Sequence, residues 1–178
     1  MRINSGRFKY IKLEIPESAR PTTEKVREAV FSMLIGRVEG ATVLDLFAGS
    51  GSLGLEALSR GAEFCVFNEG DRKNYKILKN NITNCKAEEI SSIYNNDFRK
   101  ALTLANREFD IIFVDPPYRE GYYSEVFELV EEYGLLADGG VIVAEHLNDN
   151  ELSDNILGFS RTKHKRYGTI GVDFFERA

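Results

Sequence analysis

A glycine-rich turn between a predicted strand and a predicted helix constrains the fold of this chain more than any other feature. The apolar run of residues 43–47 has the length of a buried strand, and glycines follow it at positions 49, 51 and 54. A helical pattern with one apolar face then extends from residue 52 to Gly61. These elements begin a βαβ unit, which predicts an α/β fold whose ligand binds at the carboxyl ends of parallel strands.

The class of ligand depends on Asp45, which lies near the end of the predicted strand. The spacing Gly49-x-Gly51-x-x-Gly54 matches the dinucleotide-binding pattern and alone indicates a dehydrogenase. Asp45 argues against a dinucleotide, because its carboxylate would lie close to the bound pyrophosphate and repel it. A ligand with an ammonium group and no phosphates, such as S-adenosylmethionine, suits this position. We therefore favour a methyl-donor site and keep an NAD-dependent oxidoreductase as the alternative.

The composition is typical of one globular domain. The chain has 178 residues, of which 43% are hydrophobic and 29% are charged. No apolar run approaches the ~20 residues of a membrane span, and the first residues lack the apolar core of a secretion signal. Cys65 and Cys85 lack CxxC or histidine-rich neighbours, so we expect reduced core thiols in a cytoplasmic protein. His146 and His164 lie far apart without ligand spacing, so we expect no metal site.

The net charge of −5 conceals an uneven distribution along the chain. Residues 1–37 carry a net charge of +4 and residues 159–178 carry +3, whereas residues 38–158 carry −12. The basic ends either converge into a surface that faces phosphates or are merely solvated. The first 15 residues alternate loosely between apolar and basic types, which predicts a hairpin or extended arm with Gly6 at a bend.

Two further predicted strands also end in acidic residues. Glu69 ends the strand predicted from residue 64, and Asp97 follows the strand predicted over residues 90–94. In an open parallel sheet, Glu69 can accept hydrogen bonds from both hydroxyls of a ribose, and Asp97 can accept one from an adenine amino group that Phe98 borders. Each acid has an ordinary alternative, because Glu69 also suits a helix start and Asp97 a helix cap.

The most specific chemical signal is Asp-Pro-Pro-Tyr after a fourth apolar strand at residues 109–114. Pro116 and Pro117 fix the backbone and remove two N–H donors, so the segment offers mainly acceptors. Asp115 and the Pro116 carbonyl can hold an NH₂ group, while Tyr118 can stack on the ring that carries it. Such acceptors aim the lone pair of a weakly nucleophilic nucleobase amine at a methyl group. We predict methylation of an exocyclic amine, with a rigid strand-to-helix turn as the alternative.

The remaining pattern completes an alternation of helices and strands. Thr22 or Thr23 caps a helix that ends near Gly36. Arg20 and Arg27, near its start, are either exposed residues without a role or contacts to a ligand or phosphate. The other predicted elements are a helix over residues 71–85, a helix over 119–133, a turn at 138–140, a strand over 141–145 and a hairpin over 157–176.

With these motifs the chain resembles the class I S-adenosylmethionine-dependent methyltransferases. More narrowly, it is similar to the bacterial enzymes that methylate N2 of a guanine in 16S ribosomal RNA, and the similarity extends over nearly the whole chain. It rests on Arg-Ile-Asn-Ser-Gly-Arg at 2–7, Arg-Pro-Thr-Thr at 20–23 with Val-Arg-Glu-Ala-Val-Phe at 26–31, the glycine turn at 44–57, Asp-Pro-Pro-Tyr at 115–118, Tyr-Gly at 167–168 and Phe-Phe-Glu-Arg at 174–177.

The resemblance implies an α/β fold with a Rossmann-like seven-stranded sheet, mostly parallel with its last strand antiparallel, flanked by helices. It implies a basic N-terminal extension over residues 1–22 and a methyltransferase domain over residues 23–178. The expected reaction, of the guanine(966)-N2 type, uses S-adenosylmethionine and no metal. The expected partner is 16S ribosomal RNA or the assembling small subunit, and we expect a monomer.

The expected site residues form three groups. The clamp for the guanine consists of Asp115, Pro116, Pro117 and Tyr118. The donor site consists of Thr22, Asp45, Phe47, Ala48, Gly49, Ser50, Gly51, Glu69, Asp97 and Phe98. The RNA-binding residues are Arg2, Arg7, Lys9, Arg20, Arg27, Lys165 and Arg166. Two alternatives stay open: methylation of adenine N6 or cytosine N4 in DNA or other RNA, and an RNA-binding module without catalysis.

Overall fold

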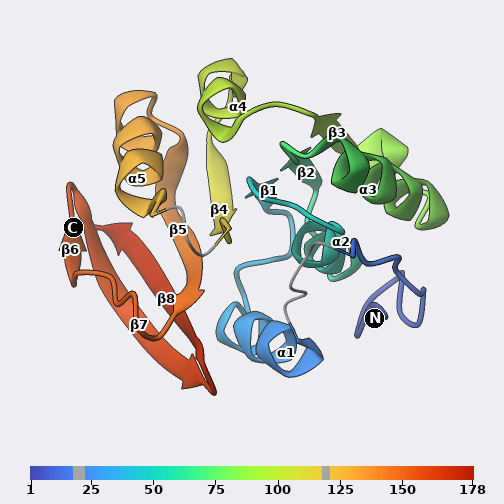
Figure 1. Ribbon diagram of the computed structural model, residues 1–178, viewed down its shortest axis with the longest axis horizontal. Coiled ribbons are helices and arrows are strands. Elements are labelled where there is room, and N and C mark those ends of the chain that lie inside the picture. The colour runs from blue at the N-terminus through green and yellow to red at the C-terminus, as the bar shows by residue number, and fades with distance from the viewer. Residues whose placement is uncertain (18–22, 118–120) are drawn as a thin grey trace.

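A mixed eight-stranded sheet forms the centre of the computed structural model, which describes residues 1–17, 23–117 and 121–178. The strand order is β3-β2-β1-β4-β5-β8-β7-β6 (Figure 1). The strands are β1 (Thr42–Asp45), β2 (Phe64–Asn68), β3 (Ser91–Tyr94), β4 (Phe109–Val114), β5 (Leu136–Leu147), β6 (Asn155–Ile156), β7 (Phe159–Tyr167) and β8 (Ile170–Arg177). The helices are α1 (Glu24–Met33), α2 (Ser52–Ser59), α3 (Arg72–Asn84), the 3₁₀ helix η1 (Glu88–Ile90), α4 (Phe98–Leu104) and α5 (Tyr123–Glu132).

The first five strands pair in parallel with one another, so their carboxyl ends lie along one edge of the sheet. The chain order reverses at β1, which pairs with β2 on one side and with β4 on the other. In open α/β sheets, ligands bind outside the carboxyl ends of the strands at such a reversal. The topology therefore predicts a ligand-binding site at the segments that follow β1 and β4.

The other end of the sheet is antiparallel. The last strand, β8, is antiparallel to both β5 and β7, as expected for the last strand. The sheet nevertheless has eight strands and not the expected seven, because residues 155–156 form β6, which pairs with β7. Two paired residues are too short to produce a periodic pattern in the sequence, which is why β6 was not predicted.

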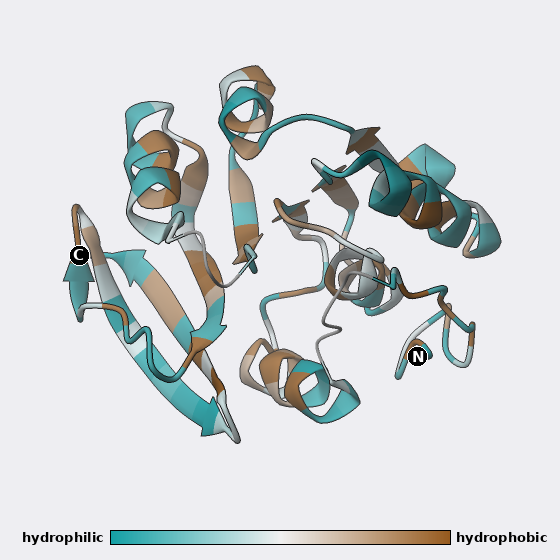
Figure 2. Ribbon diagram, viewed as in Figure 1, coloured by the Kyte–Doolittle hydropathy of each residue, from teal (hydrophilic) through white to brown (hydrophobic). Residues whose placement is uncertain are grey.

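Helices cover both faces of the sheet (Figure 1). The helices α1, α2 and α3 contribute to the hydrophobic core on one face, and α4 and α5 contribute to the core on the other. Residues of β4 alternate between these cores: Ile111 and Phe113 belong to the first, Ile112 and Val114 to the second. Figure 2 shows the central strands as mainly hydrophobic, as expected for strands buried on both faces.

The N-terminal segment packs on the same core as α1 and α2. Ile3, Phe8 and Leu13 are buried in that core. A single antiparallel bridge joins Arg2 to Lys12, so the predicted hairpin is a compact turn docked beside α2 (Figure 1). The basic residues of this segment are therefore carried on a fixed surface of the domain.

Some predicted boundaries differ from the observed ones. Thr23 caps α1 as predicted, because its Oγ1 accepts a hydrogen bond from the Val26 amide at 3.2 Å. The turn predicted at residues 138–140 lies within β5, which begins at Leu136. The predicted start of α5 at residue 119 lies outside the described residues, among which this helix begins at Tyr123. These differences leave the order of the elements unchanged.

Two predictions about the sequence as a whole can be compared with the structure. Cys65 and Cys85 are free and buried, as predicted. Within residues 1–17, 23–117 and 121–178, no helix has both the length and the apolar character that crossing a membrane requires.

Candidate active site at the carboxyl edge of the parallel strands

The glycine turn connects the end of β1 to the start of α2. Gly51 has a φ of 86°, and a Cβ atom at this residue would lie only 2.5 Å from Leu78 Cδ1. Gly54 packs on β2, where a Cβ atom would lie 2.3 Å from the ring of Phe67 and 2.8 Å from Cys65 Sγ. The two glycines therefore let the N-terminus of α2 pack closely on β2 and on Leu78 of α3.

Asp45, the last residue of β1, is a buried carboxylate. Its Oδ2 accepts a hydrogen bond from the Gly54 amide at 3.0 Å, and it forms no ion pair with another described residue. Burial raises the pKa of Asp45 to about 7; the Gly54 hydrogen bond lowers the pKa and nearby Glu69 raises it further. A buried acid without a cation is complementary to an incoming ammonium group and not to a phosphate.

Glu69 follows β2 and joins the glycine turn to the start of α3. The Gly49 amide donates to its Oε1 at 2.9 Å, and the Asp71 amide donates to its Oε2 at 2.8 Å. Burial raises the pKa of Glu69, while the two amide hydrogen bonds lower it. Each oxygen keeps a second lone pair, so the carboxylate can still accept from two hydroxyl groups. Its predicted role at a ribose stays a prediction that this geometry permits.

Asn68 is a residue that the sequence analysis missed. It is buried at the end of β2, where its Nδ2 donates to the carbonyls of Asn96 at 2.9 Å and Leu46 at 3.4 Å. Its Oδ1 accepts from the Asn96 amide at 3.2 Å, and its backbone carbonyl accepts from the Ala48 amide at 2.9 Å. Asn68 thereby connects the end of β2 to the segments that follow β1 and β3. The sequence did contain one indication of this role, because Asn68 is an amide residue at the end of an apolar strand.

Asp97 begins α4 as its N-cap, because its Oδ1 accepts from the Arg99 amide at 2.9 Å. The ordinary alternative for Asp97 is therefore observed, and its side chain remains largely exposed. The next ring, Phe98, lies 5.3 Å from Phe47 and 4.8 Å from Tyr122, measured between centroids. The Arg99 guanidinium lies over Phe98 at 4.4 Å. This aromatic cluster beside a carboxylate fits a purine base, and Tyr122 and Arg99 were not predicted as parts of it.

Asp115 follows β4 directly at the same edge of the sheet. Because Asp45 pairs with Phe113, Asp115 lies two residues beyond Asp45 on the neighbouring strand. The Asp115 side chain is half-buried. Of the other predicted clamp residues, Pro116 is buried and Pro117 is exposed, whereas Tyr118 lies outside the described residues.

Tyr123 fixes the start of α5 behind the predicted clamp. Its hydroxyl donates a hydrogen bond to the Glu145 carbonyl of β5 at 2.5 Å. Burial raises the pKa of Tyr123, and the negative charge of Asp115 raises it further, so Tyr123 stays a neutral donor. The helix that follows the clamp is thereby attached to the strand that neighbours β4.

The predicted RNA-binding residues divide between two surfaces and the interior. Arg2, Arg7 and Lys9 are exposed on the N-terminal turn, and Lys165 and Arg166 are exposed on β7. Figure 1 shows these two segments near opposite ends of the sheet, so the basic ends of the chain form separate surfaces. Two residues that the sequence analysis named, Arg20 for RNA and Thr22 for the donor, lie outside the described residues.

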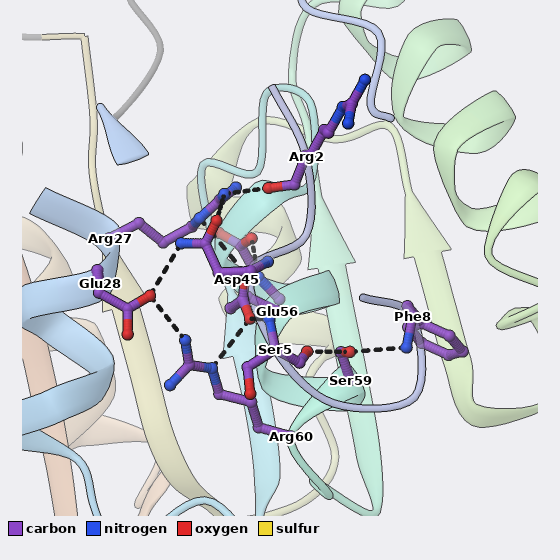
Figure 3. A network of polar contacts seen from close by, with 11 residues as sticks. Arg2, Ser5, Phe8, Arg27, Glu28, Asp45, Glu56, Ser59 and Arg60 are labelled. Carbon is purple, nitrogen blue, oxygen red and sulfur yellow. Dashed lines mark hydrogen bonds and ion pairs between the residues drawn. The ribbon is translucent and has the colours of Figure 1, made fainter. Parts of the chain in front are cut away.

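The prediction that Arg27 binds RNA is wrong, because its side chain is fully buried. Its Nη2 donates to Asn4 Oδ1 at 3.0 Å and to the Arg2 carbonyl, and its Nε lies 3.5 Å from Glu56 Oε1 (Figure 3). Burial lowers the pKa of Arg27, and the charge of Glu56 raises it. The helical pattern placed Arg27 beside the apolar stripe of α1, but a sequence does not show which charged residue has a buried partner.

The partner of Arg27, Glu56, also holds the N-terminal turn on α2. Its carboxylate accepts from the amides of Asn4 at 2.8 Å and Ser5 at 3.1 Å, and from Arg60 Nε at 2.9 Å (Figure 3). The Ser59 hydroxyl accepts from the Phe8 amide at 2.9 Å. The helix after the glycine turn is thus held from both of its sides, by the sheet and by the N-terminal turn.

The expectation of no metal site rested on the separation of His146 and His164 in the sequence, but the structure brings the two imidazoles together. They lie on β5 and β7, and both imidazoles contact the carboxylate of Asp173 on β8. Antiparallel pairing joins residues that are distant in the sequence, so the spacing of the two histidines gave no indication of this cluster.

Comparisons with known proteins agree with this architecture. The family model described as "Conserved hypothetical protein 95" matches residues 1–176. The chain is 40% identical over 182 residues to "Putative rRNA methyltransferase YlbH" of Bacillus subtilis, with 99% of each chain covered. It is 36% identical over 179 residues to "Ribosomal RNA small subunit methyltransferase D" of Escherichia coli, covering 99% of this chain and 90% of that protein.

Solved structures give the same relationship. "Putative methyltransferase yhhF from Escherichia coli" superposes with a TM-score of 0.90 at 35% identity, covering 99% of this chain and 97% of that chain. A more distant chain, "SMU.776, a putative methyltransferase complexed with SAH", has a TM-score of 0.68 at 16% identity and covers 85% of this chain and 48% of its own length, which shows the fold alone. The chain belongs to the family that contains the ribosomal RNA small subunit methyltransferase D proteins.

Proposed function

We propose that this protein transfers a methyl group from S-adenosylmethionine to the exocyclic N2 amine of a guanine in 16S ribosomal RNA, in a reaction of the guanine(966)-N2 type. The observation that carries the proposal is the position of Asp45. It is a buried acid without an ion pair among the described residues. Asp115 lies on the neighbouring strand, two residues beyond the position that pairs with Asp45. The names of the relatives, which refer to ribosomal RNA, support the choice of substrate.

The residues that would hold the donor lie along the ends of three neighbouring strands. The Asp45 carboxylate suits the ammonium of the methionine part, and the backbone from Phe47 to Gly51 would border that part. Glu69 suits the ribose hydroxyls, and Asp97 with Phe98 suits the adenine. The donor supplies an electrophilic methyl group, and the protein must hold the acceptor amine in line with it.

The Asp115 segment would orient the acceptor amine. The Asp115 carboxylate and the Pro116 carbonyl each accept one hydrogen of the guanine NH₂ group, which directs the nitrogen lone pair at the methyl group. Transfer would form the N–C bond while the bond from the donor sulfur to the methyl group breaks and the sulfur leaves as a neutral thioether; the amine then carries a surplus proton, which Asp115, as the residue that holds this amine, is proposed to accept. Tyr118 is proposed to stack on the guanine, which must leave its RNA helix to reach the clamp.

The exposed basic residues on the N-terminal turn and on β7 are proposed to contact phosphates of the RNA. Phosphate contacts position a nucleic acid without selecting its sequence, so these residues would set affinity and orientation. The proposed partner is 16S ribosomal RNA or the assembling small subunit, bound by a monomer. Arg27 has no part in this proposal.

The test is methyl transfer from a tritium-labelled donor, followed by digestion and identification of the labelled nucleoside. Unmodified small-subunit RNA, partly assembled small subunits and duplex DNA are offered in parallel. We expect label in N2-methylguanosine from one of the two RNA substrates. Label in N6-methyladenine or N4-methylcytosine would favour the alternative amine specificity. Failure to label either RNA substrate, while an authentic RNA methyltransferase labels its own, would contradict the proposal.

A further inference from the structure

Three polar side chains from the antiparallel half of the sheet converge on one another. Asp173 of β8 pairs with Ala144 of β5 on one side and with His164 of β7 on the other, and His146 lies two residues beyond Ala144. Asp173 Oδ2 lies 2.8 Å from His146 Nε2, and Asp173 Oδ1 contacts His164 Nδ1. The two imidazole nitrogens and the carboxylate oxygen all lie within 4.8 Å of one another.

The orientation of His146 is fixed by a second contact. Its Nδ1 lies 2.8 Å from the Leu147 carbonyl oxygen, which can only accept, so Nδ1 carries a hydrogen. This contact leaves Nε2 directed at the centre of the cluster. A histidine that donates from one ring nitrogen to a backbone carbonyl, while the other ring nitrogen faces a shared centre, has the arrangement of a metal ligand.

The accessibility of the cluster is asymmetric. His146 and Asp173 are buried, with 1% and 0% of their side chains exposed, whereas 29% of the His164 side chain is exposed. An ion and its water ligand can therefore reach the cluster from the side of β7, while the other two ligands are held rigidly. Tyr123 packs edge-on against the His146 ring, with the two ring centroids 6.4 Å apart.

Arg161 is the cation nearest to the cluster, and its charge is matched by acids. Its Nη1 lies 3.3 Å from Asp173 Oδ2, and its Nη2 contacts Asp154 and lies 4.0 Å from Glu151. Arg161 can thus remain hydrogen-bonded to one Asp173 oxygen and orient the carboxylate. The second oxygen, Oδ1, contacts His164 Nδ1, and it would exchange this contact for one to an ion between the imidazoles.

We infer that His146, His164 and Asp173 form a binding site for a divalent transition-metal ion, with zinc as the ion that the ligand set fits best. Zinc binds imidazole nitrogen and carboxylate oxygen at about 2.0–2.2 Å and accepts three protein ligands plus water. On binding, the metal replaces the hydrogens that the imidazole nitrogens direct at Asp173, and these leave to solvent as protons. The ion joins β5, β8 and β7 and takes no part in methyl transfer, so the inference is independent of the proposed function.

The experiment titrates the untagged full-length protein with zinc chloride against a competing chromophoric chelator, after prior removal of metal by dialysis. We expect one zinc ion per chain with a Kd of about 1 μM or tighter, and a melting temperature that rises when zinc saturates the site. His164→Gln keeps a polar group beside Asp173 at a half-exposed position and should fold. We expect this variant to bind zinc at least tenfold more weakly and to lose the zinc-dependent rise in melting temperature.

The matched control is Thr162→Gln, which changes an exposed residue of the same strand and should leave the zinc affinity unchanged. His146→Gln should weaken zinc binding as His164→Gln does. The inference is overturned if the wild-type protein binds zinc with a Kd weaker than about 100 μM. It is also overturned if both histidine variants bind zinc as tightly as the wild type, because the ion would then be held elsewhere.

Discussion

The parallel and antiparallel halves of the sheet each contain a buried aspartate, and the two aspartates have opposite surroundings. Asp45, at the end of a parallel strand, has one amide donor and no ion pair among the described residues, and its pKa is raised to about 7 by burial. Asp173, within an antiparallel strand, is also buried, but hydrogen bonds from His146 and His164 outweigh the effect of burial and lower its pKa.

The difference shows that burial alone does not determine the pKa of a carboxylate. The number of hydrogen-bond donors around the carboxylate also determines it. A buried acid with a single donor is costly to the isolated protein and suits a cation that arrives with a ligand. A buried acid with several side-chain donors stabilises its own surroundings.

The largest expected effect is at the predicted clamp. Asp115→Ala should reduce methyl transfer by at least about 10³-fold, because both the orientation of the amine and the acceptor for its proton are lost. The Kd for the donor should change by less than about threefold. Single-turnover transfer and calorimetry with S-adenosylhomocysteine measure the two quantities, and Asp138→Ala, at an exposed acid of β5, is the control. Loss of donor binding in Asp115→Ala would show that Asp115 belongs to the donor site.

The next largest effect concerns stability in the antiparallel half. Asp173→Asn should lower the free energy of unfolding by about 3 kcal/mol, because Arg161 and the two histidines lose the negatively charged carboxylate that all three contact. Urea unfolding in the presence of a metal chelator measures this change without any contribution from bound metal. An unchanged free energy of unfolding would show that the hydrogen bonds to Asp173 do not stabilise the fold, and that the two aspartates do not differ in this respect.

Asp45→Asn should have the opposite effect on stability and a strong effect on binding. Asparagine keeps the acceptor for the Gly54 amide and removes the buried charge, so the free energy of unfolding at pH 8 should rise by about 2 kcal/mol. The affinity for the donor should fall by about 50-fold, because the ammonium group loses its counter-charge. Donor binding that survives this substitution would contradict the assignment of Asp45.

The smallest predicted effect is a dependence on pH. The folded-state pKa of Asp45, about 7, lies above its ordinary value of 3.8, so its contribution to stability is present at low pH and is lost as the pH rises through 7. Donor affinity should show the reverse trend and weaken about tenfold from pH 7 to pH 5.5, a range in which an α-amino group stays charged. Calorimetry at both pH values tests this, and Asp45→Asn should show a flat profile.

The order of elements in the parallel half could be predicted well, because its proposed site residues lie at strand ends in chain order. Asp45 lies within an apolar run, and Glu69 and Asp115 come at the end of one, so a linear pattern locates them. Their neighbours were harder to find. Asn68 forms a buried bridge between strands, and Tyr122 belongs to the aromatic cluster only because α5 packs beside α4.

The antiparallel half and the buried ion pair could not be predicted in the same way. The cluster of His146, Asp173 and His164 depends on the register between three strands, which the spacing of two histidines does not reveal. Arg27 has the same local pattern whether its side chain is exposed or paired with Glu56. One sequence alone does not show which residues that are distant in the chain contact each other in the fold.

The most direct test of the account is a crystal structure with S-adenosylhomocysteine bound. The account predicts the amino group within hydrogen-bonding distance of the Asp45 carboxylate, the ribose hydroxyls on Glu69 and the adenine beside Asp97 and Phe98. A ligand bound at any other place, or a dinucleotide bound with its pyrophosphate beside Asp45, would contradict it.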